Sequence, residues 1–569
     1  MSRYLVSSAL LTLVPAALAA QQPAALPLKH AAQPTTAAIS PADLMSRLYI
    51  FADDSMQGRE TGTVGHLKST AWIASELKRL GVQSAGDEGS YFQDVPMIRR
   101  AFDPASTITV GATTLRGGTD FIAQTRGALP SLDGAGVVFG GTAGDTTSYP
   151  SRDQIRGNIV VLKAGAGGGG FAGRGGAGGA GRAQAALRAL SDAVAIATVT
   201  DNLTPTLVQA ATQPREGDVM MKPRDATPGG QLTLTITRSA AEALLGSSLD
   251  AATKGQAGRT VKASIRFRDD PAPARNVVAI IRGSDPKLRG QYVALGAHND
   301  HVGFATQALD HDSLHAYNAA RFAIRGMVPR GVQPTPEQDA AVAAIRLNLD
   351  SMRAARRTRL DSIRNGADDD GSGSVMLLEL AEAFQKAPVK PKRSLVFVWH
   401  VGEEKGLLGS RWYSEHPSVP RDSIVAQLNM DMIGRGAASD LPVGSPTYVQ
   451  LVGSRRLSTE LGDIVEAVNR TEPMPFTFDY QFDANGHPEN IYCRSDHYNY
   501  ARLGIPVVFF TTGLHGDYHQ VTDEPQYIDY PHMARIGQLV HDVTLKVANL
   551  DHRIVVDKEK PDPAGACRQ

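Results

Sequence analysis

The stretch RSLVFVWHVGEE (residues 393–404) runs from an apolar segment into two neighbouring carboxylates, Glu403 and Glu404. A near-continuous run of Val, Leu and Phe at strand length is typical of a strand buried on both faces of a sheet. Gly402 stands where this strand would end, so the backbone can bend there and aim the two glutamates differently. The stretch therefore predicts a central strand whose carboxyl end carries acidic side chains.

Four more segments of the chain have the same buried-strand character. They are NVVAIIRG (276–283), QYVALGAHND (291–300), SIVAQLNMDMIG (423–434) and IPVVFFTTG (505–513). Helical patterns lie among them, including residues 374–384 and 535–550. This layout predicts an α/β fold of three layers, with helices on both faces of a mixed, mostly parallel sheet.

Four of the five predicted strands deliver acids or histidines at, or just beyond, their carboxyl ends. A fifth source of carboxylates is RNGADDDGSG (364–373), which opens the next helix. In open α/β sheets, ligands bind in the crevice beyond this edge. The side chains that would meet there are His298, Asp300, His301, Asp368, Asp369, Asp370, His400, Glu403, Glu404, Asp431, His515, Asp517, Tyr518 and His519.

Each of these motifs alone has an ordinary explanation, because an Asp-Asp-Gly turn is usually a helix cap and a Glu-Glu pair usually faces solvent. Their joint occurrence at strand ends favours a metal site. Histidine, aspartate and glutamate without cysteine form the ligand set of zinc and, less specifically, of cobalt or manganese. Asp369, Glu404 and Asp431 carry three negative charges, and an ionised Glu403 adds a fourth, so charge balance favours two divalent ions.

The N-terminus has the features of an export signal. MSRYLVSSALLTLVPAALAA (1–20) has a basic start, an apolar run and small residues at its end, which predicts a signal peptide and a secreted or periplasmic protein. Residues 21–40 are predicted to be flexible, and residues 551–569 form a C-terminal tail. The only two cysteines, Cys493 and Cys567, could form one bridge, and the sequence leaves their pairing open.

Composition excludes two classes of partner. Lys+Arg and Asp+Glu both number 58, so the formal net charge is zero and nucleic acid is not an expected ligand. No stretch after the signal peptide is long and apolar enough to predict stable membrane insertion. The oligomeric state is not indicated by the sequence.

A first internal segment, residues 105–272, departs from the α/β pattern. It contains short strand-like runs at 134–141, 157–165 and 192–201. Its glycine-rich stretch at 165–182 is too long and loose to cradle a phosphate, and we expect it to be a loop. The composition predicts a separate β-rich domain.

A second internal segment, residues 304–363, is polar, Arg-rich and predicted to be helical. Thr335-Pro336-Glu337-Gln338 has the spacing of a capping box, with proline at the first helical position. We expect this excursion to lie over the edge of the sheet and to narrow the cleft. Its histidines, His311 and His315, are expected on the surface rather than among the ligands.

The segments GAHNDHVG, GADDDGSG, GEEKGLLGS, LNMDMIGR and YHQVTDE contain the clusters described above. Together they closely resemble the signature segments of family twenty-eight of the metallopeptidases, which comprises di-zinc aminopeptidases and related exopeptidases. Residues 53–81 are similar to the helical lead-in of that family, and residues 105–272 look like its inserted protease-associated (PA) domain. The resemblance implies a zinc exopeptidase fold, with a catalytic domain formed by residues 41–104 and 273–550.

The resemblance also implies roles for individual residues. His298 and Asp431 would hold one zinc ion, Glu404 and His519 the other, and Asp369 would bridge both. Three further residues would act around them: Asp300 would orient His298, Glu403 would be the general base that takes a proton from the water between the ions, and Tyr518 would help to stabilise the oxyanion. A cis peptide after Asp369 is implied as well.

The function that the resemblance implies is that of a secreted di-zinc aminopeptidase acting on peptides with a free N-terminus. A carboxypeptidase or dipeptidase of the same fold is an alternative. Glutaminyl cyclases share the architecture but resemble a one-zinc variant, whereas this sequence keeps the ligands of both sites. A non-catalytic, receptor-like binding protein is the alternative from another class, and the presence of all five ligands and the base argues against it.

Overall fold

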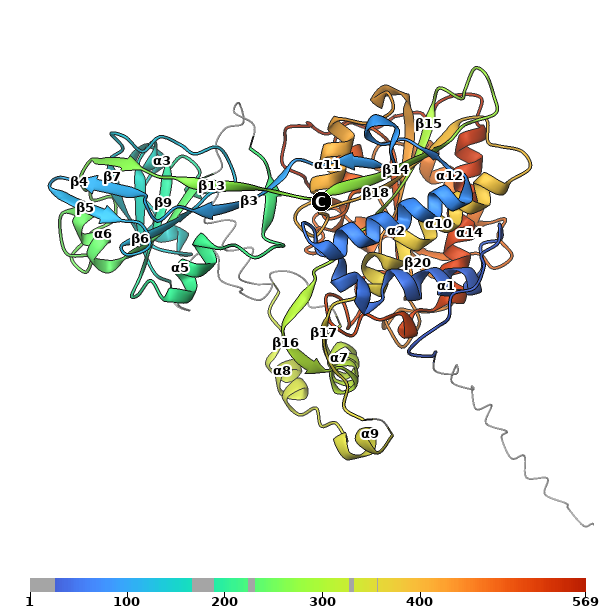
Figure 1. Cartoon of the computed structure of the whole chain (residues 1–569), viewed down its shortest axis with the longest axis horizontal. Helices are drawn as coiled ribbons and strands as arrows, with labels where there is room; N and C mark the ends of the chain where they lie inside the picture. Colours follow the sequence, from blue (N-terminus) through green and yellow to red (C-terminus); the bar gives the residue numbers. More distant parts are fainter. Residues whose placement is uncertain (1–25, 166–188, 224–230, 327–331, 356) are drawn as a thin grey trace, which may run out of the picture.

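The computed structural model describes residues 26–165, 189–223, 231–326, 332–355 and 357–569. Figure 1 shows three parts: an α/β body, a β-rich lobe beside it, and a smaller projection that carries β16 and β17. The predicted signal peptide and most of the glycine-rich stretch lie outside the described residues.

A mixed sheet of nine strands forms the centre of the α/β body. Its four middle strands run parallel to one another, and antiparallel strands flank them on both sides. In spatial order the strands are β1 (Gln83–Ser84), β14 (Arg275–Ile281), β18 (Ser394–His400), β15 (Tyr292–His298), β19 (Ile424–Met430), β22 (Val507–Thr511), β20 (Tyr448–Val452) and β21 (Thr477–Asp479), with β2 (Phe92–Asp94) also paired to β14.

Alternate side chains of the central strands enter two different cores. Leu395, Phe397 and Trp399 of β18 pack into the larger core, whereas Val396 and Val398 pack into the other. All five are fully buried, which is the burial on both faces that the apolar runs predict. The predicted three-layer α/β arrangement is therefore present.

Helices cover both faces of the sheet. The larger core lies under α1 (Pro41–Phe51), α2 (Val64–Leu80), α10 (Gly373–Lys386), α12 (Thr459–Asn469) and α14 (Tyr530–Asn549), and the opposite face is covered by α11 (Leu408–Glu415) and α13 (His497–Ala501). Helix α2 begins after the cap Thr63 and ends at Gly81, whose φ of 72° suits a glycine cap.

The β-rich lobe has its own core and joins the body through a ribbon of β3 (Met97–Phe102) and β13 (Phe267–Ala272), to which β10 (Val219–Met221) adds a third strand. Predicted strands in this segment correspond to β7 (Val137–Thr142), β8 (Ile159–Lys163) and β9 (Ala195–Thr200). Around them lie β4 (Thr107–Val110), β5 (Thr113–Arg116), β6 (Phe121–Gln124), β11 (Leu232–Thr237), β12 (Val261–Ser264), α3 (Arg152–Ile155), α5 (Pro205–Thr212) and α6 (Arg238–Leu245). Its assignment as a PA domain stays a prediction.

The 304–363 excursion is the projection seen below the body in Figure 1. It contains α7 (His311–Arg325), α8 (Pro336–Ala343) and α9 (Leu349–Ala355), and the predicted capping box at Thr335 is formed. The helical prediction was incomplete, because a ribbon of β16 (Phe304–Asp310) and β17 (Leu360–Ile363) carries these helices.

The expected surface position of His311 is wrong. Its side chain is fully buried, between the ring of Tyr527 and the side chains of Asp312 and Arg359. His315 is partly exposed, as expected, and stacks on Tyr527 with ring centroids 3.9 Å apart. An aromatic ring supplied by another segment, which periodicity cannot reveal, explains the burial.

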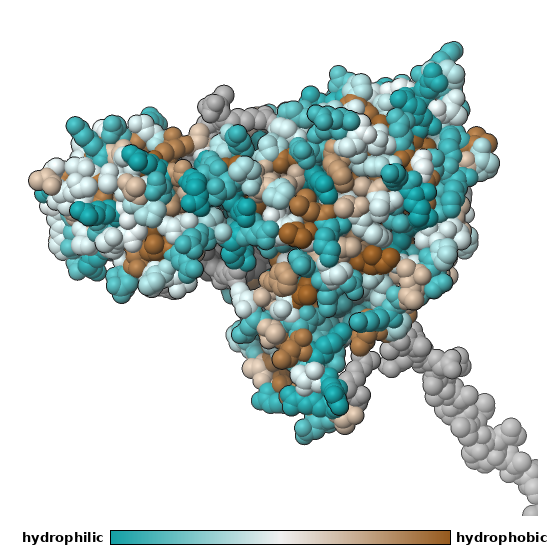
Figure 2. Space-filling model, viewed as in Figure 1, coloured by the Kyte–Doolittle hydropathy of each residue, from teal (hydrophilic) through white to brown (hydrophobic). Residues whose placement is uncertain are grey.

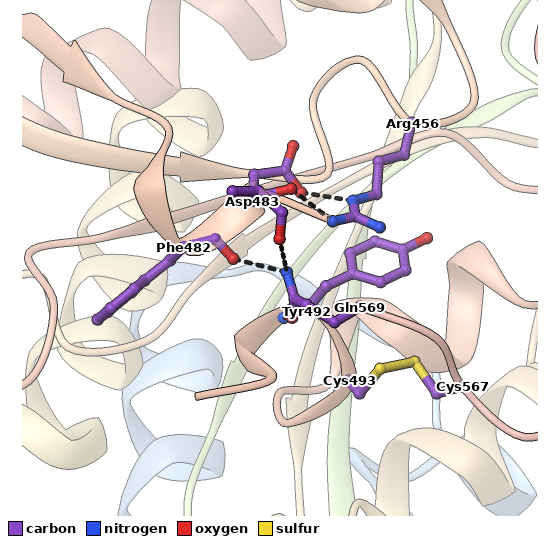
Figure 3. Close-up of a disulfide and its surroundings, with 8 residues drawn as sticks. Arg456, Phe482, Asp483, Tyr492, Cys493, Cys567 and Gln569 are labelled. Atoms are coloured by element: carbon purple, nitrogen blue, oxygen red, sulfur yellow. Dashed lines mark hydrogen bonds and ion pairs between the residues drawn. A yellow bond between two sulfur atoms is a disulfide. The ribbon is translucent and has the colours of Figure 1, made fainter. Parts of the chain in front are cut away.

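Cys493 and Cys567 form a disulfide, which resolves the question that the sequence left open. Figure 3 shows the bond next to two further contacts of the C-terminal residue. The backbone N–H of Tyr492 donates to Gln569 Oε1 at 2.9 Å, and Gln569 Nε2 donates to the carbonyl of Phe482 at 2.8 Å. The tail is thus fixed to the segment around residues 482–493.

Within the described residues, the helices are all too short or too polar to cross a bilayer. The face shown in Figure 2 is mainly hydrophilic, with apolar side chains in small, scattered groups.

Candidate metal centre

The four parallel strands bring the predicted residues to one edge of the sheet. Strand β15 ends at His298, β18 leads into Glu403 and Glu404, and β19 leads into Asp431. Strand β22, next to β19, leads into the loop that carries His519. Because the carboxyl ends of parallel strands meet at the same edge, residues far apart in the sequence become neighbours.

The three consecutive aspartates have separate partners. Asp368 accepts the N–H of Gly434 at 2.6 Å, and Asp370 accepts the N–H of His298 at 2.9 Å. Only Asp369 turns both carboxylate oxygens toward histidines, as the contacts below show. The peptide bond between Asp369 and Asp370 is cis, as the resemblance implied.

Asp523 fixes the backbone of this aspartate segment. Its carboxylate accepts the N–H groups of Asp368, at 3.0 Å, and of Asp369, at 3.1 Å. Asp523 is fully buried and belongs to the YHQVTDE segment, four residues after His519. Nothing local to Asp523 predicts contact with a segment so distant in the chain, so its role is not evident from the sequence.

A first group of ligand atoms contains His298, Asp369 and Asp431. His298 Nε2 lies 3.1 Å from Asp369 Oδ1 and 3.7 Å from Asp431 Oδ1. The other oxygen of Asp431 accepts a hydrogen bond from Ser495 Oγ at 2.7 Å, which fixes the orientation of the carboxylate.

A second group shares Asp369 and adds Glu404 and His519. His519 Nε2 lies 3.0 Å from Asp369 Oδ2 and 3.1 Å from Glu404 Oε1. The structure places a further histidine here that the predicted ligand set did not include: His301 Nδ1 lies 2.9 Å from Glu404 Oε1 and 3.7 Å from Asp369 Oδ2.

The donor set of both groups fits a metal of the zinc type. The ligand atoms of His301, Asp369, Glu404 and His519 all lie within 4.8 Å of one another. Several of these atoms are buried without a hydrogen bond, namely His298 Nε2, His301 Nδ1, Asp369 Oδ2, Glu404 Oε1 and His519 Nε2. Buried polar atoms normally have hydrogen-bond partners. Five nitrogen and oxygen atoms that lack them and that converge on two points therefore indicate cation sites.

A third group, His311, Asp361 and Glu524, also has ligand atoms within 4.8 Å of one another. Here two of the carboxylate oxygens already accept hydrogen bonds from the protein. Asn365 Nδ2 donates to Glu524 Oε1 at 3.0 Å, and Ile363 N–H donates to Asp361 Oδ1 at 2.9 Å. The guanidinium of Arg359 contacts His311 Nδ1. A cationic neighbour and satisfied carboxylates do not favour a metal at this place.

Asp300 lies beside His298 but contacts it differently from the expected arrangement. His298 Nδ1 is 3.0 Å from the backbone carbonyl of Asp300, whereas the Asp300 carboxylate is 3.8 Å away. That carboxylate accepts from Thr61 Oγ1 at 2.7 Å and from the N–H of Glu403 at 3.2 Å. Asp300 therefore orients the imidazole through its backbone and holds the Glu403 backbone through its side chain.

Glu403 and Glu404 point to different places because the chain turns at the end of β18. Gly402 has φ of 70°, and the N–H of Gly406 donates to the Glu403 carbonyl at 2.9 Å. Glu404 joins the second ligand group, whereas Glu403 faces the pocket described next. Burial raises the pKa of Glu403 well above its usual range.

A pocket opens beside these ligand groups. Asp369, Glu403 and Asp431 line its inner end, and its apolar wall consists of Met432, Phe482, Ile491, Phe509 and Leu514. Tyr518 also lines it; burial raises the pKa of Tyr518 to about 12, so its hydroxyl stays a proton donor.

Arg494 also lines the pocket, and nothing in the sequence predicts it there. Its Nη2 donates to the hydroxyl of Tyr518 at 3.3 Å. Its Nη1 lies 3.0 Å from Glu489 Oε2, which offsets part of its charge. The spacing of motifs in the sequence identifies neither Arg494 as a pocket residue nor His301 as a ligand. For His301, the one available indication is its position three residues after His298 in GAHNDH.

Comparison with known proteins adds independent findings. Residues 340–544 match the model of peptidase family M28. Leupeptin-inactivating enzyme 1 of Streptomyces exfoliatus is 42% identical over 127 residues, which cover 21% of this chain and 28% of that protein. Leucine aminopeptidase 1 of Paracoccidioides brasiliensis (strain Pb18) is 26% identical over 238 residues, or 40% of this chain and 56% of that protein. The chain thus spans about half or less of the length of these curated relatives.

Among solved structures, BSAP, a zinc aminopeptidase from Bacillus subtilis, is similar with a TM-score of 0.44 at 16% identity, over 90% of this chain and 96% of that one. An aminopeptidase from Aneurinibacillus sp. strain AM-1 gives a TM-score of 0.44 at 17% identity, over 92% and 97%. The stretch of residues 340–544 that matches peptidase family M28 contains four of the five signature segments around the candidate metal centre.

Proposed function

We propose that this chain is a two-zinc aminopeptidase that removes N-terminal residues from peptides. The observation that carries the proposal is that Asp369 contacts His298 with one carboxylate oxygen and His519 with the other, while Glu403 faces the pocket beside them. The similarity to leucine aminopeptidase 1 of Paracoccidioides brasiliensis supports this activity.

The residues of the chain divide the work of hydrolysis. His298 and Asp431 would hold one zinc ion, Glu404 and His519 the other, with Asp369 between them. When bound, zinc supplies Lewis acidity toward a carbonyl and lowers the pKa of water. Glu403 accepts the proton of the attacking water and passes it to the leaving amine, and the Tyr518 hydroxyl donates a hydrogen bond to the developing oxyanion.

The pocket favours an apolar side chain at the cleaved residue. Its wall is built from aliphatic, thioether and aromatic side chains, which suit an apolar side chain of the substrate. We therefore propose that peptides with Leu, Met or Phe at the N-terminus are preferred over those with Asp or Gly.

A carboxypeptidase or dipeptidase is the second candidate, and Arg494 is the observation that favours it. A guanidinium that lines the pocket beside Glu403 is suited to bind a substrate carboxylate in a bidentate manner. Glu489, 3.0 Å away, competes for that guanidinium, which is why we place this candidate second.

We also propose that the protein is exported to the periplasm or the medium. The predicted signal peptide supports this, and the disulfide between Cys493 and Cys567 agrees with an oxidising compartment.

A panel of matched peptides tests the activity. Leucine peptides with a free N-terminus should be cleaved, acetylated forms should resist, and amidation of the C-terminus should have little effect. Glu403→Gln should keep its zinc content and lose about 10²- to 10⁴-fold in kcat. Equal cleavage of free and acetylated peptides would refute the aminopeptidase assignment, and loss of cleavage on C-terminal amidation would favour the second candidate.

A further inference from the structure

We infer that His301 is a fourth protein ligand of the metal site formed by Asp369, Glu404 and His519. The inference rests on the metal centre of the proposed function and deepens it. It makes the two sites unequal: one has two imidazoles and two carboxylates, and the other has His298, Asp369 and Asp431.

The position of the His301 ring agrees with tetrahedral coordination. Zinc–nitrogen and zinc–oxygen bonds of about 2.0 to 2.2 Å place neighbouring donors of a tetrahedron about 3.4 Å apart. His301 Nδ1 lies 2.9 Å from Glu404 Oε1 and 3.7 Å from Asp369 Oδ2, and His519 Nε2 lies 3.1 and 3.0 Å from the same two atoms. The two imidazoles therefore converge on the same two oxygens.

His301 has no hydrogen-bond partner outside this ligand group that would explain its burial. The residue is fully buried, and neither Nδ1 nor Nε2 makes a hydrogen bond in the described part of the chain. A buried imidazole without a partner is costly, because its polar atoms lose water and gain nothing in return. A cation on Nδ1 removes the part of that cost that falls on Nδ1.

Two neighbouring segments hold the ring in place. The N–H of His301 donates to the Arg59 carbonyl at 3.3 Å, and the Arg59 guanidinium donates to the carbonyl of Gly366 at 2.9 Å. Gly366 has φ of 55°, and a Cβ on it would lie 2.6 Å from Cδ2 of His301. The glycine thus makes room for the imidazole directly before the aspartate segment.

Unequal ligand numbers predict unequal affinities. Four protein ligands saturate a tetrahedral zinc site, as in structural sites, whereas three leave a position open for water or substrate. The site with His301 is therefore expected to fill first and to release its ion last. The site with His298 is expected to be the exchangeable one.

X-ray absorption on the wild-type chain tests the ligand count without any variant. With one equivalent of zinc, the average number of imidazoles per ion should be two; a value of one would overturn the inference. With two equivalents, the average should lie between one and two, because three imidazoles are shared by two ions.

A variant tests the affinity. His301→Ala should weaken the tighter zinc site by roughly 100-fold or more, beyond the 10- to 100-fold that loss of an outer contact costs, as measured by competition with a chelator. His301→Asn, which keeps a polar group, is a second variant in case alanine disturbs folding. The control is His532→Asn, a buried histidine of α14 whose Nδ1 contacts the Arg435 carbonyl; it should keep both affinities.

These outcomes separate the inference from the proposed function. If both His301 variants bind zinc as tightly as the wild type and peptides are still cleaved, the ligand role of His301 fails and the aminopeptidase stands. If the wild type shows two imidazoles on its first zinc and cleaves no peptide, the ligand role stands and the aminopeptidase fails.

Discussion

At the scale of single residues, Asp369 connects the two halves of the centre. Its Oδ1 faces His298 and its Oδ2 faces His519, whereas Asp368 and Asp370 accept backbone N–H groups. Three adjacent carboxylates thus avoid mutual repulsion because each has its own positive or donor partner.

Asp369→Asn is therefore expected to remove metal from both sites at once. Its zinc content should fall from the proposed two ions per chain towards none, and kcat/KM should fall by about 10³-fold or more, because the proposed hydrolysis depends on the ions. Asp368→Asn should instead lower the free energy of unfolding. An asparagine can still accept the hydrogen bond from the Gly434 N–H, but it is uncharged, so the bond is weaker. Zinc analysis and a thermal melt of both variants distinguish the two effects; equal zinc loss would contradict the assignment.

Glu524 provides a pH-dependent contribution to stability. Burial raises the pKa of Glu524 to about 8, against an ordinary value of 4.5, and Asn365 is its hydrogen-bond partner. A raised folded pKa means that the folded state binds the proton more tightly than the unfolded state. Its contribution is complete below about pH 4.5 and is lost as the pH rises to about 8.

Glu524→Gln, which is neutral at every pH, should therefore be more stable than the wild type above pH 8 and similar to it near pH 4.5. The expected difference at pH 9 is on the order of 4 kcal/mol in the free energy of unfolding. Urea unfolding at the two pH values measures it. A stability difference that does not change with pH would contradict the raised pKa.

At the scale of elements, a disulfide links the C-terminal tail to the wall of the pocket. Cys567 in the tail is bonded to Cys493, which ends a short helical turn that begins at Ile491. Ile491 and Arg494 line the pocket on either side of this cysteine. The disulfide, whose cysteines are 74 residues apart, therefore fixes the wall as well as the tail.

Cys567→Ser should lower the free energy of unfolding by about 2 to 4 kcal/mol, because the unfolded chain loses a loop constraint. KM should rise more than kcat falls, since the bond lies beside the pocket and not among the ligands. The double variant with Cys493→Ser is the control and should equal the single variant. No effect of a reducing agent on wild-type stability would show that the bond does not contribute.

The 304–363 excursion acts on the loop that presents His519. His315 Nδ1 lies 2.9 Å from Asp517 Oδ2, and Asn318 Nδ2 donates to Asp517 Oδ1 at 3.4 Å. Arg435 Nη2 donates to the same carboxylate at 3.2 Å. Helix α7 thus supports a ligand loop, which is a role beyond the narrowing of the cleft that the sequence suggests.

At the scale of the whole molecule, buried strands and their polar ends were predictable because both depend on local sequence. The apolar run 394–400 and the acids that follow it define a strand and its functional edge without any knowledge of neighbours. The same holds for α2 and for the capping box at Thr335.

What the sequence could not reveal depends on contacts between distant segments. The sequence predicts His301 at the functional edge, but its contact with Glu404 depends on Arg59 and Gly366, which position the ring. His311 is buried by Tyr527, which comes from a segment far along the chain. The β16–β17 ribbon is exposed or half-buried along its length, and its segments FATQALD and LDSI lack the strict apolar alternation by which strands are recognised.

The central claim is that two zinc ions, held by the Asp369-centred ligands, enable this chain to release N-terminal residues. The most direct test adds zinc in known equivalents to the metal-free chain and measures the hydrolysis of a leucine peptide with a free N-terminus. The account predicts no hydrolysis without metal and a rate that stops rising at two equivalents. Full activity without metal, or a plateau at one equivalent, would contradict it.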